Sequence, residues 1–459
     1  MKPKVPTIPG ADKLFIGGRW HQPSSDQFMS VISPSDEEEV MQVAVPAIAD
    51  ADIAVAAARD AFDRGPWPRM SMAERAVCCE RLAAELEKRL DRLNLAWMFE
   101  SGAPVAHGEM INSGAGKMIW RNAIELAKSL PEEEYRSGGG VIIRREPVGT
   151  TLGVLTYNGP VVLMGMKVIP ALLAGCPMII KHAPESALTA RIIAEAIEEA
   201  DLPSGVASVL PAGTEVTQHL VGHAGVDMIA LTGGTNIAVD VVKRSADRLA
   251  RTALELGGKS PAILAEDVDF NEVAKTLIDG STGFLGQVCV SLSRILVPRS
   301  RYDEFVELWA EKYSSLSLGP AWDTTVDRGP LAVERALLRA EKMVGQAVDE
   351  GATIAAGGKR PENLIKGWYF EPTLISDVTN RMSIAQEEVF GPVTAVIPYE
   401  GIEEAIEIAN DSPFGLAASV YTQDSDLAMS VARQLRTGGV AVNLAGISLT
   451  EPFGGVKQS

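Results

Sequence analysis

Two kinds of hydrophobic pattern follow each other along this chain. Apolar residues at helical spacing fill an alanine-rich segment at 50–62 and a longer run that continues to about Glu100. The longer run opens at Ser71-Met-Ala-Glu74, a capping box that is typical of a helix start. From about residue 141, short strand-like runs alternate with helix-like segments. Such alternation predicts a parallel sheet with helices on both faces.

The alternation falls into two series, one on each side of residue 257. The strand-like runs of the first series are TLGVLTY, PMIIK, ASVL and VDMIAL, and the second series runs from PAILA to GGVAVN. A segment at 129–146, with a glutamate triplet and three consecutive glycines, precedes the first series and is typical of an excursion away from the first domain. We therefore predict an α/β fold with two doubly wound parallel-sheet domains, comprising residues 1–128 with 147–257, and residues 258–457.

The composition is that of an ordinary globular chain and excludes several classes of function. With 459 residues, 46% apolar and 22% charged, the chain can bury a large core and form two or three domains. Its formal charge of −18 repels phosphate backbones and anionic lipids, and no apolar run reaches the roughly twenty residues of a membrane helix. We expect no nucleic-acid or membrane partner. The N-terminus lacks a signal-peptide pattern, which favours a cytoplasmic location.

Cysteine and histidine spacing indicates neither a disulfide scaffold nor a metal site. The four cysteines contain no C-x-x-C pair, and Cys78, Cys79 and Cys176 occur in contexts that favour packing. His219 and His223 are one helical turn apart, and we expect no further acidic or cysteine ligand near them. We therefore expect no metal, and any cysteine chemistry would use a single free thiol.

Neither of the two common nucleotide-binding signatures is present. There is no G-x-G-x-x-G, and Gly258-Lys259-Ser260 resembles the end of a phosphate loop but has Ala253 in place of the first glycine. Thr232-Gly-Gly-Thr235 follows a strand-like run, where backbone N–H groups at a helix start can face a phosphate. Taken alone, such a turn is more often an ordinary loop.

Four residues stand where an α/β sheet places its chemistry. Asn158, Lys181 and Glu255 follow or close strand-like runs, and ligands of open α/β sheets bind beyond the carboxyl ends of the strands. Cys289 lies between a predicted helix and the strand-like SLSRILV. Each also has an ordinary structural interpretation, as a turn asparagine, a solubilising lysine, an ion-paired acid or a buried thiol. Taken singly, these residues leave the function open.

The joint order of short motifs resembles the aldehyde dehydrogenase superfamily from about residue 14 to the last residue. Along the chain, the motifs that carry this resemblance are LFIGGRW, TYNGP, GCPMIIKHAPES, LTGGT, LELGGKSP, GQVC, EEVFGP, FGLAASVYT and PFGGVKQS. Glu255 and Cys289 also stand at the separation usual in the family. Nine motifs in register across nearly the whole chain make this more than a chance resemblance.

The resemblance implies a hydrolytic, nicotinamide-dependent aldehyde dehydrogenase. Cys289, with a modestly lowered thiol pKa, would add to the aldehyde as a thiohemiacetal whose oxyanion faces the Asn158 amide and the Cys289 backbone N–H. Hydride transfer would leave a thioester, and Glu255 would activate the water that hydrolyses it. Lys167 completes the implied catalytic set. The first domain would bind the cofactor and the second would carry the catalytic cysteine.

The same resemblance assigns a cofactor site for NAD, with NADP possible. Lys181 is placed at the adenosine ribose and Glu388 at the nicotinamide ribose, with Phe390 beside the nicotinamide. Pro184 stands where many NAD-preferring members carry a ribose-binding glutamate, and Glu185 follows it, so the preference between the two cofactors stays open. The remaining implied cofactor positions, which include the phosphate-facing turn, are Tyr157, Thr232, Gly233, Gly234, Leu256 and Gly257.

The positions that line the family's substrate tunnel are, by local register, mostly aliphatic in this chain. Because no charged residue appears among them, we expect a hydrophobic aldehyde, which could be aliphatic, terpenoid or aryl. Core packing accounts equally well for the methionines of the helix in this set. The positions are Gly159, Val162, Leu163, Met166, Val288, Val290, Ile447 and Phe453.

The segment at 129–146 resembles the family's β oligomerisation arm, so we expect a homodimer or homotetramer. Family members continue past the position of Ser459 with a strand that joins a neighbouring subunit, and we expect that partner strand to be missing here. Two other functions stay open. A CoA-acylating relative would lack the general-base glutamate, and Glu255 argues against it. An inactive structural member is disfavoured by the joint presence of Cys289, Asn158 and Glu255.

Overall fold

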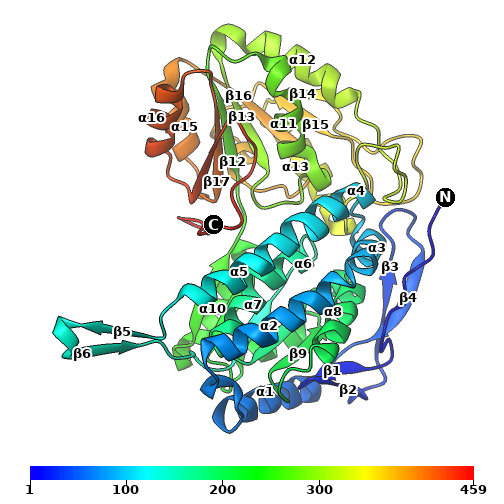
Figure 1. Cartoon of the computed structure of the whole chain (residues 1–459). Coiled ribbons are helices and arrows are strands. Elements are labelled where there is room, and N and C mark those ends of the chain that lie inside the picture. Colours follow the sequence, from blue (N-terminus) through cyan, green and yellow to red (C-terminus); the bar gives the residue numbers. More distant parts are fainter.

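Two seven-stranded sheets organise the chain, and the computed structural model describes all residues 1–459 (Figure 1). The predicted α/β class with two parallel-sheet domains is confirmed. The first sheet has the strand order β11 (Arg251–Glu255), β10 (Met228–Thr232), β7 (Thr151–Val154), β8 (Met178–His182), β9 (Ala207–Pro211), β1 (Leu14–Ile16) and β2 (Arg19–His21).

The first sheet is buried on both faces, as its uninterrupted apolar strands predict. In β8, Met178 and Ile180 point into one core while Ile179 points into the other, because successive side chains of a strand alternate between faces. The five strands from β11 to β9 are parallel, whereas β1 pairs antiparallel with β9 and β2 pairs antiparallel with β1. The sequence pattern did not predict these two three-residue strands. They are too short for a period-2 signal and depend on pairing with β9.

Helices cover the two faces of this sheet. The capping box is confirmed, since Glu74 accepts a hydrogen bond from the Ser71 backbone N–H at 2.7 Å. The expectation of one run to Glu100 is wrong, because the helix breaks near Arg89, which donates to Glu195 at 2.8 Å. On one face lie α2 (Met72–Glu87), α3 (Leu90–Ser101), α5 (Lys117–Ser129), α7 (Ile169–Leu173) and α8 (Ala187–Glu199), and on the other α1 (Ile48–Asp63), α9 (Thr214–Gly222) and α10 (Thr235–Ser245).

Packing of α1 against α9 brings distant polar residues together. Asp52 of α1 lies beside His219 and His223 at the C-terminal end of α9. The expectation that the histidine pair has no further ligand nearby is therefore wrong in three dimensions. The reason is that Asp52 lies more than a hundred residues from the pair in the sequence, whereas the contact between the two helices brings it next to the pair in the fold.

The second sheet is parallel except at its edge, where β14 pairs antiparallel with β15. Its strand order is β14 (Thr353–Ala356), β15 (Thr373–Ser376), β16 (Val393–Tyr399), β13 (Leu292–Pro298), β12 (Ser260–Leu264), β17 (Ala417–Tyr421) and β18 (Gly439–Val442). The helices packed on its faces are α11 (Phe270–Thr282), α12 (Tyr302–Ser314), α13 (Glu334–Asp349), α15 (Gly401–Asn410) and α16 (Ser425–Gln434).

Two small hairpins complete the fold. Strands β5 (Glu133–Arg136) and β6 (Val141–Arg144) form an arm that projects away from the body of the molecule (Figure 1). Strands β3 (Phe28–Ile32) and β4 (Glu39–Ala44) form the other hairpin, and the loop between them contacts the second half of the chain, where Tyr369 donates to the Ser35 carbonyl at 2.8 Å. No helix combines the length and the apolar composition needed to cross a bilayer.

Candidate active site

A rigid loop carries Cys289 between α11 and β13. Phe284, Leu285 and Gly286 are three consecutive residues in the left-handed region, with φ of 46°, 49° and 67°. This conformation costs a non-glycine residue about 1–2 kcal/mol, and backbone strain of this kind concentrates at functional sites. Gln287 holds the loop in place, because its side chain accepts from the Ala332 backbone N–H at 3.0 Å and donates to the Phe284 carbonyl at 3.1 Å. Cys289 follows as a free, partly exposed thiol.

Glycines allow this loop to approach its neighbours. A Cβ added to Gly258 would collide with the Cys289 carbonyl oxygen, and one added to Gly286 would collide with the Gly391 carbonyl oxygen. Gly286 also needs its positive φ. Glycine is therefore required at both positions, and the Gly257-Gly258 turn after β11 passes directly against the cysteine loop.

The Asn158 side chain reaches the cysteine loop from the other half of the molecule. Asn158 follows β7, and its Nδ2 donates to the Gln287 carbonyl at 3.0 Å. Thr156 donates to Asn158 Oδ1 at 2.6 Å, which fixes the amide orientation with its N–H groups toward the loop. Thr156 and Gln287 are positioning residues that sequence reasoning missed. Their place inside the motifs TYNGP and GQVC was the available signal.

Glu255 and Lys167 form an electrostatic pair beside the loop. Burial raises the pKa of Glu255, and the nearby Lys167 opposes this rise. Burial lowers the pKa of Lys167 to about 8, and Glu255 opposes this fall. Lys167 lies in a π-helical turn, Met164–Val168, a feature frequent at functional sites. Glu255 Oε2 is buried without a hydrogen-bond partner, so it is available to a water molecule or a proton.

The Cys289 thiol is protonated in this environment. Burial, with the charges of Glu388 and Glu255, raises the pKa of Cys289 to about 12, while the backbone N–H groups of Cys289 and Val290 oppose the rise. The expected modest lowering of this pKa is therefore wrong for the protein alone. Sequence motifs locate the thiol but do not report that two carboxylates surround it.

Glu388 and an aromatic pair lie next to the Gly257-Gly258 turn. Glu388 Oε1 accepts from the Gly258 backbone N–H at 3.1 Å, and a Cβ on Gly257 would collide with the Glu388 carboxylate. Phe390 packs edge-to-face with Tyr157 at 6.3 Å between ring centroids. Leu256, between Glu255 and the turn, is buried in the core of the first sheet. Glu388, predicted for the nicotinamide ribose, therefore lies at the turn that passes against the cysteine loop, together with the predicted cofactor position Gly257.

The positions predicted for the adenosine and phosphate end lie at the carboxyl ends of β8 and β10. Lys181 is the residue before the last one of β8 and is nearly buried, and burial lowers its pKa to about 8. Gly234, with Gly233 before it, starts α10 without a side-chain cap, so the first N–H groups of an eleven-residue helix are free. Thr232 Oγ1 is buried without a partner. A free helix start beside an unpaired hydroxyl suits the phosphates of a dinucleotide.

The sequence and the two-sheet fold match one known family. A model of the aldehyde dehydrogenase family matches residues 20–459. The chain belongs to that family. The prediction of an aldehyde dehydrogenase, and hence of an oxidoreductase, is confirmed.

Individual members of the aldehyde dehydrogenase family resemble the chain along almost its whole length. The geranial dehydrogenase of Castellaniella defragrans is 38% identical and covers 97% of this chain and 94% of its own. A Mycobacterium tuberculosis aldehyde dehydrogenase complexed with NAD+ is 40% identical with a TM-score of 0.95, covering 99% and 94%. A Pseudomonas syringae aldehyde dehydrogenase C cysteine-to-alanine mutant, in complex with NAD+ and octanal, is 34% identical with a TM-score of 0.94, covering 98% and 93%.

The predicted substrate positions of this aldehyde dehydrogenase lie on three segments. Val288 and Val290 flank Cys289. Val288 packs against a small core that contains Trp97 and Phe284, and so does Ile111, which was not among the predicted substrate positions. Met166 packs partly against the large core of the first sheet, as its alternative interpretation predicted. The predicted positions whose residues stay partly exposed are Gly159, Val162, Met166, Val288, Val290, Ile447 and Phe453, whereas Leu163 is buried.

Proposed function

We propose that the chain oxidises an aldehyde to a carboxylic acid with NAD, or with NADP, and that Cys289 is the nucleophile. The observation that carries this proposal is the meeting of three distant segments around the Gly257-Gly258 turn. Asn158 contacts the cysteine loop directly, and the charge of Glu255 acts on the Cys289 thiol. The NAD+ held by two of the similar structures supports the choice of cofactor.

The first step is addition of the Cys289 sulfur to the carbonyl carbon. The thiol proton must leave to solvent first, because burial and the charges of Glu388 and Glu255 raise the pKa of Cys289 to about 12. The backbone N–H groups of Cys289 and Val290 stabilise the thiolate. The Asn158 amide and the Cys289 N–H then donate to the thiohemiacetal oxyanion.

The second half of the reaction releases the acid. A nicotinamide cofactor, when bound, accepts the hydride from the former aldehyde carbon. Lys181, the Thr232–Gly234 turn and Glu388 would hold it, and residues 1–128 with 147–257 would form its domain. Water then hydrolyses the thioester: its proton passes to the Glu255 carboxylate, its hydroxide adds to the acyl carbon, and the carbon–sulfur bond breaks. The proton on Glu255 passes to the departing Cys289 sulfur, which regenerates the thiol and the carboxylate for the next turnover.

The test is a cofactor-reduction assay with NAD and NADP on the wild type and on Cys289→Ala. We expect the variant to lose activity while it keeps cofactor binding. Cys78→Ala is the matched control, because this thiol is buried in α2 and should leave turnover unchanged. Full activity of Cys289→Ala would refute the nucleophile. Formation of acyl-CoA when CoA is added would instead favour the acylating alternative.

We further propose that the substrate is a hydrophobic aldehyde. The partly exposed Val288 and Val290, on either side of Cys289, offer apolar side chains next to the thiol, and apolar walls favour apolar ligands. Two similar proteins support a hydrophobic substrate: one is named geranial dehydrogenase, and the other was solved in complex with octanal. We expect octanal and benzaldehyde to exceed betaine aldehyde and succinate semialdehyde in kcat/KM. The reverse order would refute the proposed substrate class.

Self-association into a homodimer or homotetramer is proposed from the arm and from α10. An isolated two-stranded hairpin is marginally stable in water, yet β5 and β6 project from the body with Tyr135 and Ile142 exposed. Helix α10 exposes Ile237, Val239 and Val242 along its length. Light scattering after size-exclusion chromatography should give a mass of two or four chains. A monomer at micromolar concentration would refute the proposal.

A further inference from the structure

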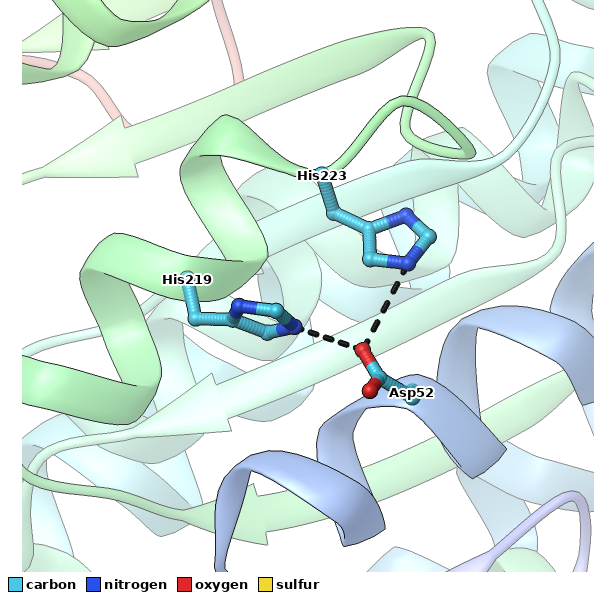
Figure 2. A group of neighbouring side chains, drawn as sticks. All are labelled: Asp52, His219 and His223. Atoms are coloured by element: carbon cyan, nitrogen blue, oxygen red, sulfur yellow. Dashed lines mark hydrogen bonds and ion pairs between the residues drawn. The ribbon is translucent and has the colours of Figure 1, made fainter.

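A carboxylate and two imidazoles converge where α1 packs against α9. Figure 2 shows Asp52 of α1 facing His219 of α9 and His223, which follows the last turn of that helix. The distance from Asp52 Oδ1 to His219 Nε2 is 2.5 Å, and to His223 Nε2 it is 3.5 Å. The side chains of Asp52, His219 and His223 are 51%, 31% and 28% exposed. The cluster is thus open to solvent, and none of its three residues belongs to the candidate active site around Cys289.

We propose that Asp52, His219 and His223 form a binding site for a divalent transition-metal ion of the zinc, nickel and copper class. The three ligand atoms lie within 4.8 Å of one another, so small side-chain rotations can bring all three to one ion. Two imidazoles one helical turn apart with a carboxylate form a donor set that these ions prefer, and water can supply the fourth position. The net charge of −18 favours a cation.

The His223 ring already makes a hydrogen bond that bears on metal binding. The Gly225 backbone N–H donates to His223 Nδ1 at 2.9 Å, which places the proton of the neutral ring on Nε2. An ion at Nε2 displaces this proton to Nδ1 and breaks the Gly225 hydrogen bond. The site is therefore weaker than one preorganised for metal.

Metal binding at this site would clamp α1 to α9. Both helices pack on the same face of the first sheet, and the ion would add a cross-link between side chains that the metal-free protein joins only through hydrogen bonds and ion pairs. A ligand that binds only the folded state stabilises it by an amount that grows with the logarithm of the ligand concentration relative to its Kd. Zinc should consequently raise the melting temperature of the full chain.

The test measures zinc binding to the full chain by isothermal titration calorimetry in chelator-free buffer. The Cys289→Ser background removes the one partly exposed thiol as a competing ligand. The test variants are Asp52→Asn, His219→Gln and His223→Gln. Asp60→Asn is the matched control, because Asp60 lies on the same helix with a similar exposure of 54%. Cobalt binding to the otherwise unmodified chain gives a visible spectrum that reports imidazole coordination, even where a variant folds poorly.

We expect one equivalent of zinc and a higher melting temperature. Loss of an indirect partner of a metal ligand already costs about ten- to a hundredfold in affinity, so each test variant should weaken binding by at least about tenfold. Asp60→Asn should bind like its parent. Three results would overturn the site. They are the absence of stoichiometric zinc binding, His219→Gln and His223→Gln variants that bind zinc as tightly as their parent, and a cobalt spectrum that shows the hydrated ion alone.

Discussion

Replacement of Glu255 by glutamine tests the hydrolytic half of the proposed reaction. The change keeps the size of the side chain but removes the carboxylate that would take a proton from water. Glu255 Oε2 is buried without a protein partner, so no existing hydrogen bond is lost from that atom. The fold should persist, and the effect should fall on the chemistry.

The size of the effect follows from the neighbours of Glu255. General-base catalysis contributes about 10²–10⁴-fold, which corresponds to about 2.7–5.4 kcal/mol at 1.36 kcal/mol per decade. The pKa of Lys167 is about 8 while Glu255 raises it. Without that carboxylate the pKa of Lys167 falls further, and the neutral amine can act as a substitute base. We therefore expect thioester hydrolysis to slow by about 10²–10³-fold, with the larger loss reserved for Glu255→Gln combined with Lys167→Met.

The assay follows reduced cofactor in the first turnover and in the steady state. Hydride transfer precedes hydrolysis, so a burst of reduced cofactor should remain in Glu255→Gln while the steady rate falls. The wild-type hydrolysis rate should decline as the pH drops through the raised pKa of Glu255, because protonation removes the base, and the variant should lose that limb. Glu266→Gln, on the surface after β12, is the control. Loss of the burst with intact cofactor binding would refute this role.

Three further changes probe the geometry of the site. Gly258→Ala should lower kcat by about a hundredfold, because its Cβ displaces the Cys289 carbonyl, while Gly345→Ala, whose Cβ meets open space in α13, should leave kcat unchanged. Thr156→Val should lower kcat without changing cofactor affinity, since the Asn158 amide loses its orienting donor, and equal loss in both quantities would contradict this. Lys181 is cationic below its pKa of about 8, so cofactor affinity should fall as the pH rises through that value, and equilibrium titration of Lys181→Met should show no such dependence.

Burial and long-range contacts account for what the sequence missed. The predicted continuous helix breaks near Arg89, whose side chain donates to Glu195 more than a hundred residues away. The raised pKa of Cys289 depends on two carboxylates brought to it by separate segments. The domain boundaries remain predictions. The roles of single residues also remain predictions, because they concern binding and turnover rather than the fold.

The sequence by itself determined the family, the alternation of strands and helices, and the identity of the residues at the junction, because periodicity and motifs are local properties of the chain. Tertiary structure decided which of these residues touch and what charges they carry. Asn158 meets the Gln287 carbonyl, and Asp52 meets His219, across more than a hundred residues of sequence. The physical reason is that desolvation and proximity arise only when distant segments pack together, and no spacing along the chain encodes the distance between two packed helices.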